Sequence, residues 1–161
     1  MKKRLSSVLL AGVLVSIAPI QQALADDMAV VKAFYNELLS AATAADLDER
    51  TKNVLVDNWE SIPTPRGGAG REGMVKTLAQ FGAAIPDLRW EIQEILKDGN
   101  RYIVRSLATG TPAKKVFGVE PKGNSFKIMT IDIHTVENGK IVQSYHVEEW
   151  LKAKYQLQKG S

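Results

Sequence analysis

An α+β fold is predicted by the order in which two kinds of pattern occur along the chain. Up to residue 85, apolar residues recur mainly at the three- and four-residue spacing of helices. From Pro86 onward, segments of strand length alternate with turn signals such as Asp98-Gly99 and Asn138-Gly139. We therefore expect a curved antiparallel sheet wrapped over helices that precede it.

The first helix is expected just after Asp26 and Asp27, either of which can cap it. Its apolar positions form one stripe: Val30, Val31, Phe34, Leu38 and Leu39. A second, short helix is expected over Leu47–Asn53, followed by a strand over Val54–Ile62.

The segment Pro63–Gly70 interrupts regular structure because it holds two prolines and three glycines. It is not a phosphate loop, since no lysine and hydroxyl follow at the required spacing. A third helix is expected over Arg71–Ala84.

Four strands and a closing helix are expected in the second half of the chain. The strands are Leu88–Leu96, Arg101–Thr109, Phe126–Val136 and Lys140–Val147, and the helix is Glu148–Gln158. Asn138-Gly139 is a strong short-range signal for a hairpin between the last two strands.

Residues 1–25 have the features of a cleavable secretory signal. Lys2, Lys3 and Arg4 precede an apolar stretch, which ends at Ala23-Leu24-Ala25, a small-x-small cleavage pattern. The apolar stretch is shorter than the roughly 20 residues that span a bilayer, so we expect no stable membrane anchor. The sequence predicts a periplasmic or secreted protein, cut after Ala25, with a single domain at residues 26–161.

The basic charge of the whole chain belongs to this signal. The chain has 21 Lys and Arg against 18 Asp and Glu, and three of the basic residues but no acidic residue lie in the signal. Residues 26–161 are therefore close to neutral, and we expect no nucleic-acid partner. With no cysteine and two histidines, disulfides, thiol catalysis, cysteine zinc sites and three-histidine metal sites are excluded. A mixed site of histidine and carboxylate ligands stays open, but no signature spacing supports it, and no metal site is predicted.

The order of motifs over the region from Val54 to the C-terminus resembles the SnoaL-like polyketide cyclase and ester cyclase family. The matching stretches are Ile85–Trp90, Asp98–Arg105, Ala108–Thr111, Phe117–Gly123, Ile131–Ile141 and Tyr145–Leu151. This resemblance implies the cone-shaped fold of the nuclear transport factor two-like superfamily, in which a bent sheet and helices enclose one apolar pocket. Members of this family are often dimers, so the resemblance also implies a homodimer.

The resemblance further implies cofactor-free acid–base chemistry. In such cyclases a pocket carboxylate removes a proton from carbon next to carbonyl groups, and the enolate closes a ring by aldol attack. Burial in an apolar pocket raises the pKa of a carboxylate and makes it a better base near neutral pH.

The candidate catalytic residues are Asp132, His134, His146 and Glu148. Asp132 and His134 are two residues apart on one expected strand, as are His146 and Glu148 on the next, so each pair shares a face. A two-residue loop at Asn138-Gly139 would set the pairs on opposite faces, whereas a three-residue loop with a bulge at Gly139 would bring all four together. The pattern leaves both registers open, and it leaves open that the two histidines are structural.

Three further residues are candidates for substrate binding. Trp59 and Tyr35 are expected to line the pocket or to belong to the core, and Arg105 is expected to meet a substrate carboxylate or a neighbouring acid. Glu148 and Glu149 are expected to divide between pocket and solvent.

Two functions follow from this pattern. The first is an exported, cofactor-free enzyme that abstracts a proton from a small apolar carbonyl or ester compound, with cyclisation or isomerisation as the outcome. The alternative is a non-catalytic periplasmic protein that binds a small hydrophobic ligand in the same pocket. A third alternative is a dimerisation module whose pocket is filled.

Overall fold

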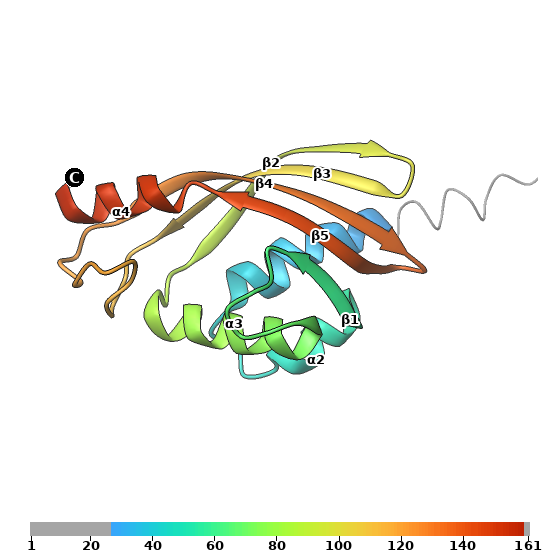
Figure 1. Ribbon diagram of the computed structural model, residues 1–161, viewed down its shortest axis with the longest axis horizontal. Coiled ribbons are helices and arrows are strands. Elements are labelled where there is room, and N and C mark those ends of the chain that lie inside the picture. The colour runs from blue at the N-terminus through green and yellow to red at the C-terminus, as the bar shows by residue number, and fades with distance from the viewer. Residues whose placement is uncertain (1–26, 160–161) are drawn as a thin grey trace, which may run out of the picture.

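The computed structural model describes residues 27–159, so the expected signal at residues 1–25 lies outside the described residues. Figure 1 shows one curved sheet that arches over the helices of the first half of the chain, with α4 continuing from the end of β5. The predicted α+β class with a cone-like arrangement of helices under a bent sheet is confirmed.

The helical layer consists of three parts. A helix at residues 27–33 continues into a π-helical segment, η1 (Phe34–Leu38), and a 3-10 turn, η2 (Leu39–Ala41). The short helix α2 (Leu47–Val54) precedes strand β1, and α3 (Gly70–Ala84) follows it. Phe34 and Leu38 of η1 are buried, as the apolar stripe predicted, and Tyr35 beside them is buried as well.

The sheet contains five strands in the order β1-β5-β4-β3-β2. Their bounds are β1 (Leu55–Ile62), β2 (Arg89–Asp98), β3 (Arg101–Gly110), β4 (Phe126–Glu137) and β5 (Lys140–Glu148). Strands β2 to β5 pair antiparallel, but β1 pairs with β5 in parallel, which the sequence pattern did not predict. The closing helix α4 (Trp150–Lys159) begins two residues after Glu148, which ends β5.

The β4–β5 hairpin combines features of the two registers considered above. Glu137 pairs with Lys140 across a two-residue turn, in which Asn138 and Gly139 both have positive φ, as a type I′ turn requires. The register then shifts, because Thr135 pairs with Gln143 and Val136 with Ile141. This bulge in β5 places Asp132 opposite His146.

The core lies between the sheet and the helices. On β3 and β4 buried residues alternate with more exposed ones, so one face of each strand points at the helical layer. The buried apolar side chains form one cluster, which includes Leu38, Leu78, Val104 and Ile128. Within residues 27–159, no helix has the length and apolar character needed to cross a bilayer.

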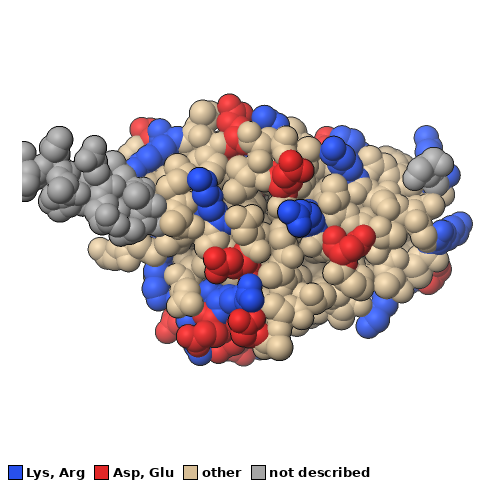
Figure 2. Space-filling model, turned by 180° about the vertical axis from the view of Figure 1, so that it is seen from behind, with Lys and Arg blue, Asp and Glu red and all other residues tan. Residues whose placement is uncertain are grey.

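Charged side chains of both signs are interspersed on the surface drawn in Figure 2. Ion pairs at the surface of the protein include Lys52 with Asp48 and Arg71 with Asp57. This face therefore presents no extended field of one sign.

Candidate active site

A cavity of about 640 Å³ lies between the concave face of the sheet and the helical layer. Much of its wall is aromatic: Phe34, Trp59, Phe81, Trp90, Phe117 and Trp150. Its polar side chains include four from the β4–β5 hairpin, which are Asp132, Ser144, His146 and Glu148. The cavity thus has largely apolar walls and a group of polar side chains on the hairpin, while Arg66, Gln80 and Lys115 add further polar groups to its lining. This combination is typical of a small-molecule site.

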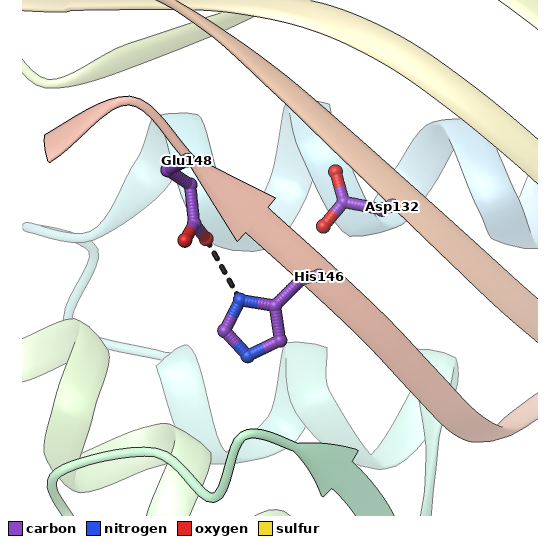
Figure 3. A group of neighbouring side chains, drawn as sticks. All are labelled: Asp132, His146 and Glu148. Atoms are coloured by element: carbon purple, nitrogen blue, oxygen red, sulfur yellow. Dashed lines mark hydrogen bonds and ion pairs between the residues drawn. The ribbon is translucent and has the colours of Figure 1, made fainter.

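Three of these polar side chains form a close group, shown in Figure 3. Asp132 comes from β4 and His146 and Glu148 from β5, and one polar atom of each lies within 4.8 Å of the others. The bulge in β5 shifts the register so that Asp132 lies directly opposite His146 in the sheet. This shift brings the three side chains together.

The hydrogen bonds of His146 indicate its protonation state. Its Nε2 lies 3.0 Å from the carbonyl oxygen of Pro63, which can only accept, and its Nδ1 lies 2.8 Å from Oε1 of Glu148. Burial alone would lower the pKa of His146, but the hydrogen bond and charge of Glu148 outweigh it, and the pKa is raised. An imidazolium that donates to both acceptors satisfies this geometry.

Asp132 is only 5% exposed and is held in a different way. Burial raises its pKa to about 7, while the hydrogen bond from Tyr35 acts in the opposite direction and the charge of Glu148 adds to the rise. The Tyr35 hydroxyl donates to Oδ2 over 2.9 Å. Asp132 is thus a carboxyl group that exchanges a proton near neutral pH while facing an apolar cavity.

His134 shares the face of Asp132 but is fully buried and is not part of the cavity wall. Burial, with a smaller contribution from the charge of His146, lowers its pKa to about 3. The hairpin thus brings the four candidate catalytic residues to one face, as the bulged register predicted, although the turn has two residues and the bulge lies between Ile141 and Gln143 rather than at Gly139. A ligand in this cavity can contact Asp132, His146 and Glu148 directly, but it cannot contact His134.

The other candidates lie in three different environments. Trp59 lines the cavity, whereas Tyr35 is fully buried behind Asp132 and does not line it. Arg105 is not a cavity residue, because the inward positions of β3 are its even-numbered ones, and its Nε pairs with Oε2 of Glu94 at 3.3 Å. For both residues the structure shows the second of the alternatives considered above: Tyr35 belongs to the core, and Arg105 pairs with a neighbouring acid.

Glu148 and Glu149 divide as predicted. Glu148 faces the cavity, while Glu149 accepts hydrogen bonds from the backbone of Met129 and from Lys152. The sequence interpretation missed Ser144, although its position two residues before His146 on one strand is a usable signal. It also missed the Pro63 carbonyl, which no side-chain pattern reveals.

Asp132, His146 and Glu148 are also the group among residues 27–159 whose donor atoms are close enough to share a metal ion. A metal would have to displace the proton between His146 and Glu148. Because the Pro63 carbonyl holds the other nitrogen of His146, the arrangement satisfies the imidazole completely without a metal.

Comparison with known proteins agrees with this architecture. A family model described as SnoaL-like polyketide cyclase matches residues 29–157. Comparison with curated protein sequences gave no match.

Among solved structures, TsrD from Streptomyces laurentii is 22% identical, with a TM-score of 0.66, over 89% of this chain and 97% of that one. Wild-type IdmH from Streptomyces antibioticus is 20% identical, with a TM-score of 0.70, over 82% and 98%. A SnoaL-like polyketide cyclase from Agrobacterium tumefaciens is 22% identical, with a TM-score of 0.65, over 81% and 97%. At these identities the structures establish the shared fold.

Proposed function

The chain belongs to the SnoaL-like polyketide cyclase family, and from that premise we propose that it is a cofactor-free enzyme that removes a proton from carbon next to a carbonyl group. The observation that carries the proposal is Asp132, a buried carboxyl group with a pKa of about 7 at the wall of an apolar cavity. A base is most effective when its pKa lies near the working pH.

Asp132 is the general base of this proposal. Its carboxylate takes the proton of the carbon acid, the electron pair of the C–H bond becomes the enolate, and Asp132 becomes a neutral acid. Since Tyr35 occupies Oδ2, the other carboxylate oxygen, Oδ1, is the one to receive the proton. The acid later returns the proton to the product.

His146 supports the reaction by its charge. Both of its ring nitrogens donate to acceptors, Glu148 and Pro63, so it acts as a fixed cation beside the developing negative charge. Glu148 keeps this cation in place. A pre-arranged charge in an apolar site costs little reorganisation during the reaction.

The cavity indicates the kind of substrate. Its aromatic walls and volume of about 640 Å³ suit a small, largely apolar carbonyl or ester compound. A carbon acid flanked by two carbonyl groups is acidic enough to react without a metal or cofactor. Attack of the enolate on a second carbonyl gives cyclisation, and return of the proton to another carbon gives isomerisation.

Deuterium exchange tests the proposal without knowledge of the natural substrate. A panel of aryl ketones and β-keto esters is incubated with the protein in D₂O, and deuterium at the α-carbon is measured against buffer alone. We expect faster exchange for at least one compound with the unmodified protein and with Arg105→Gln, a control outside the cavity. Exchange at the buffer rate across the panel would contradict the proposal.

The alternative function is binding without chemistry, and the apolar walls of the cavity favour it equally. It predicts that a small hydrophobic molecule purifies with the protein, is released unchanged on denaturation, and gains no deuterium in the presence of the protein. Mass spectrometry of the released molecule separates the two functions.

Export and self-association are further parts of the proposal. The pattern at residues 1–25 supports export with cleavage after Ala25, which mass spectrometry of the secreted or periplasmic protein tests directly. Exposed Met129, Tyr145 and Val147 share the outer face of β4 and β5 and support a homodimer through that face. Analytical ultracentrifugation should give a dimer that Val147→Lys weakens, and a monomer at all concentrations would contradict it.

A further inference from the structure

A continuous chain of hydrogen bonds runs through the buried core to Asp132. Trp59 Nε1 lies 3.0 Å from Ser144 Oγ, which lies 2.8 Å from Nδ1 of His134. On the other side of the ring, Nε2 of His134 lies 2.9 Å from the Tyr35 hydroxyl, which lies 2.9 Å from Oδ2 of Asp132. All five side chains are at least nine-tenths buried.

The two ends of this chain determine its direction. The indole of Trp59 can only donate, and an ionised Asp132 can only accept. The single proton of the Tyr35 hydroxyl therefore points to Asp132, so Tyr35 must accept from Nε2–H of His134. A neutral His134 with its proton on Nε2 has a bare Nδ1, which accepts from the Ser144 hydroxyl, and Ser144 accepts from Trp59.

This arrangement pairs every donor and acceptor in the chain. With the proton of His134 on Nδ1 instead, the Tyr35 hydroxyl would have to donate to Nε2, and the carboxylate of Asp132 would keep only the weaker support of Thr130. Loss of a hydrogen bond to a buried carboxylate is costly, so one tautomer of His134 fits an ionised Asp132.

We propose that Tyr35, His134 and Ser144 are positioning residues: anchored by Trp59, they form a one-directional donor chain that aims the Asp132 carboxylate at the cavity and keeps it ionisable. The proposal deepens the function given above and rests on it for its role in catalysis. The existence and direction of the hydrogen-bond chain are inferred from its distances and donor groups and do not depend on the proposed function.

The surroundings of Asp132 make this support necessary. Burial and the charge of Glu148 favour its neutral form, whereas Tyr35 and the charge of His146 favour the ionised form. Tyr35 keeps its own proton, because burial and then the charge of Asp132 raise its pKa well above the usual value. Since each hydrogen bond polarises the next, the effect of Ser144 and His134 reaches Asp132 through Tyr35.

Side-chain NMR of the purified protein tests the chain without a substrate. At a pH above the titration of Asp132, nitrogen-15 spectra should show His134 neutral with its proton on Nε2. A proton on Nδ1 at that pH would overturn the proposal. This measurement uses the unmodified protein, so it tests the hydrogen-bond chain even if a variant fails to fold.

Carbon-13 titration of the Asp132 carboxyl, assigned by its loss in Asp132→Asn, supplies the second readout. Tyr35→Phe removes a hydrogen bond to a charged group and should raise the midpoint by about one to two pH units. Ser144→Ala should raise it by less. An unchanged midpoint in Tyr35→Phe would also overturn the proposal.

Tyr102→Phe is the matched control, because Tyr102 is equally buried and its hydroxyl has no hydrogen-bond partner among the described residues. It should leave the Asp132 midpoint unchanged. If deuterium exchange fails while the His134 proton and the Asp132 midpoints behave as stated, the proposed enzyme activity is contradicted and the hydrogen-bond chain is supported. If exchange occurs but the His134 proton or the midpoints differ, the hydrogen-bond chain is contradicted and the activity is supported.

Discussion

Two histidines on one face of the β4–β5 hairpin lie in opposite environments. His146 borders the cavity, and its two nitrogens meet a carboxylate and a carbonyl. His134 is on the neighbouring strand, fully buried, and its two nitrogens meet two hydroxyls. The pKa of the first is raised and that of the second is lowered to about 3.

The difference shows that the partners and burial of an imidazole, rather than its place on a strand, determine its charge. Groups that only accept require a proton on each nitrogen, whereas hydroxyls allow one nitrogen to remain bare. Asp132 lies between the two environments and takes support from both: a cation on the cavity side and a neutral donor chain on the core side.

The largest expected effect is the loss of activity in Asp132→Asn. The amide keeps the shape of the side chain but cannot take up a proton, so deuterium exchange should fall by about 10²- to 10⁴-fold. The exchange rate of the best compound in the panel measures this. Retained exchange would show that Asp132 is not the general base and would assign that role to the His146–Glu148 pair.

The same variant should gain stability at alkaline pH. The pKa of Asp132 is raised from 3.8 to about 7, so the folded protein binds more protons than the unfolded chain between those values, and stability falls as the pH rises through them. Above pH 7 the ionised group costs about 4 kcal/mol, which Asp132→Asn removes. Urea unfolding at pH 5 and 9 measures the difference between the two proteins, which should be larger at pH 9.

His146→Gln tests the cavity side of the comparison. Glutamine can still hydrogen-bond, but it carries no charge, so we expect exchange to fall by about 10²-fold, with the fold retained. Circular dichroism serves as the control for folding. An unchanged exchange rate would show that the cation does not assist Asp132.

The smallest expected effect is the difference between the titration curves of the His146 and His134 rings. His146 should titrate above the usual value near 6.5, whereas His134 should stay neutral down to about pH 4, since its pKa is about 3. Proton and nitrogen-15 spectra across this range give both curves. If the two rings titrate together, the contrast between cavity and core is wrong.

Much of the fold could be predicted from the sequence because its signals are local. The apolar stripe of the first helix, the break at Pro63–Gly70 and the positive-φ turn at Asn138-Gly139 each depend on neighbouring residues. The expected strands agree with β1 to β5 to within one or two residues at each end. Asp132 drew attention for the same reason, since it is an acid between two isoleucines.

The sequence alone thus determined the order of elements, the turn and the residue types able to exchange protons. Tertiary structure decided the bulge in β5, the parallel β1–β5 pair and the placement of Tyr35 behind Asp132. It also decided that His134 is neutral whereas His146 carries a positive charge. The physical reason is that register, burial and hydrogen-bond partners arise between segments up to about a hundred residues apart, as Tyr35 and His134 are, and local patterns do not encode them.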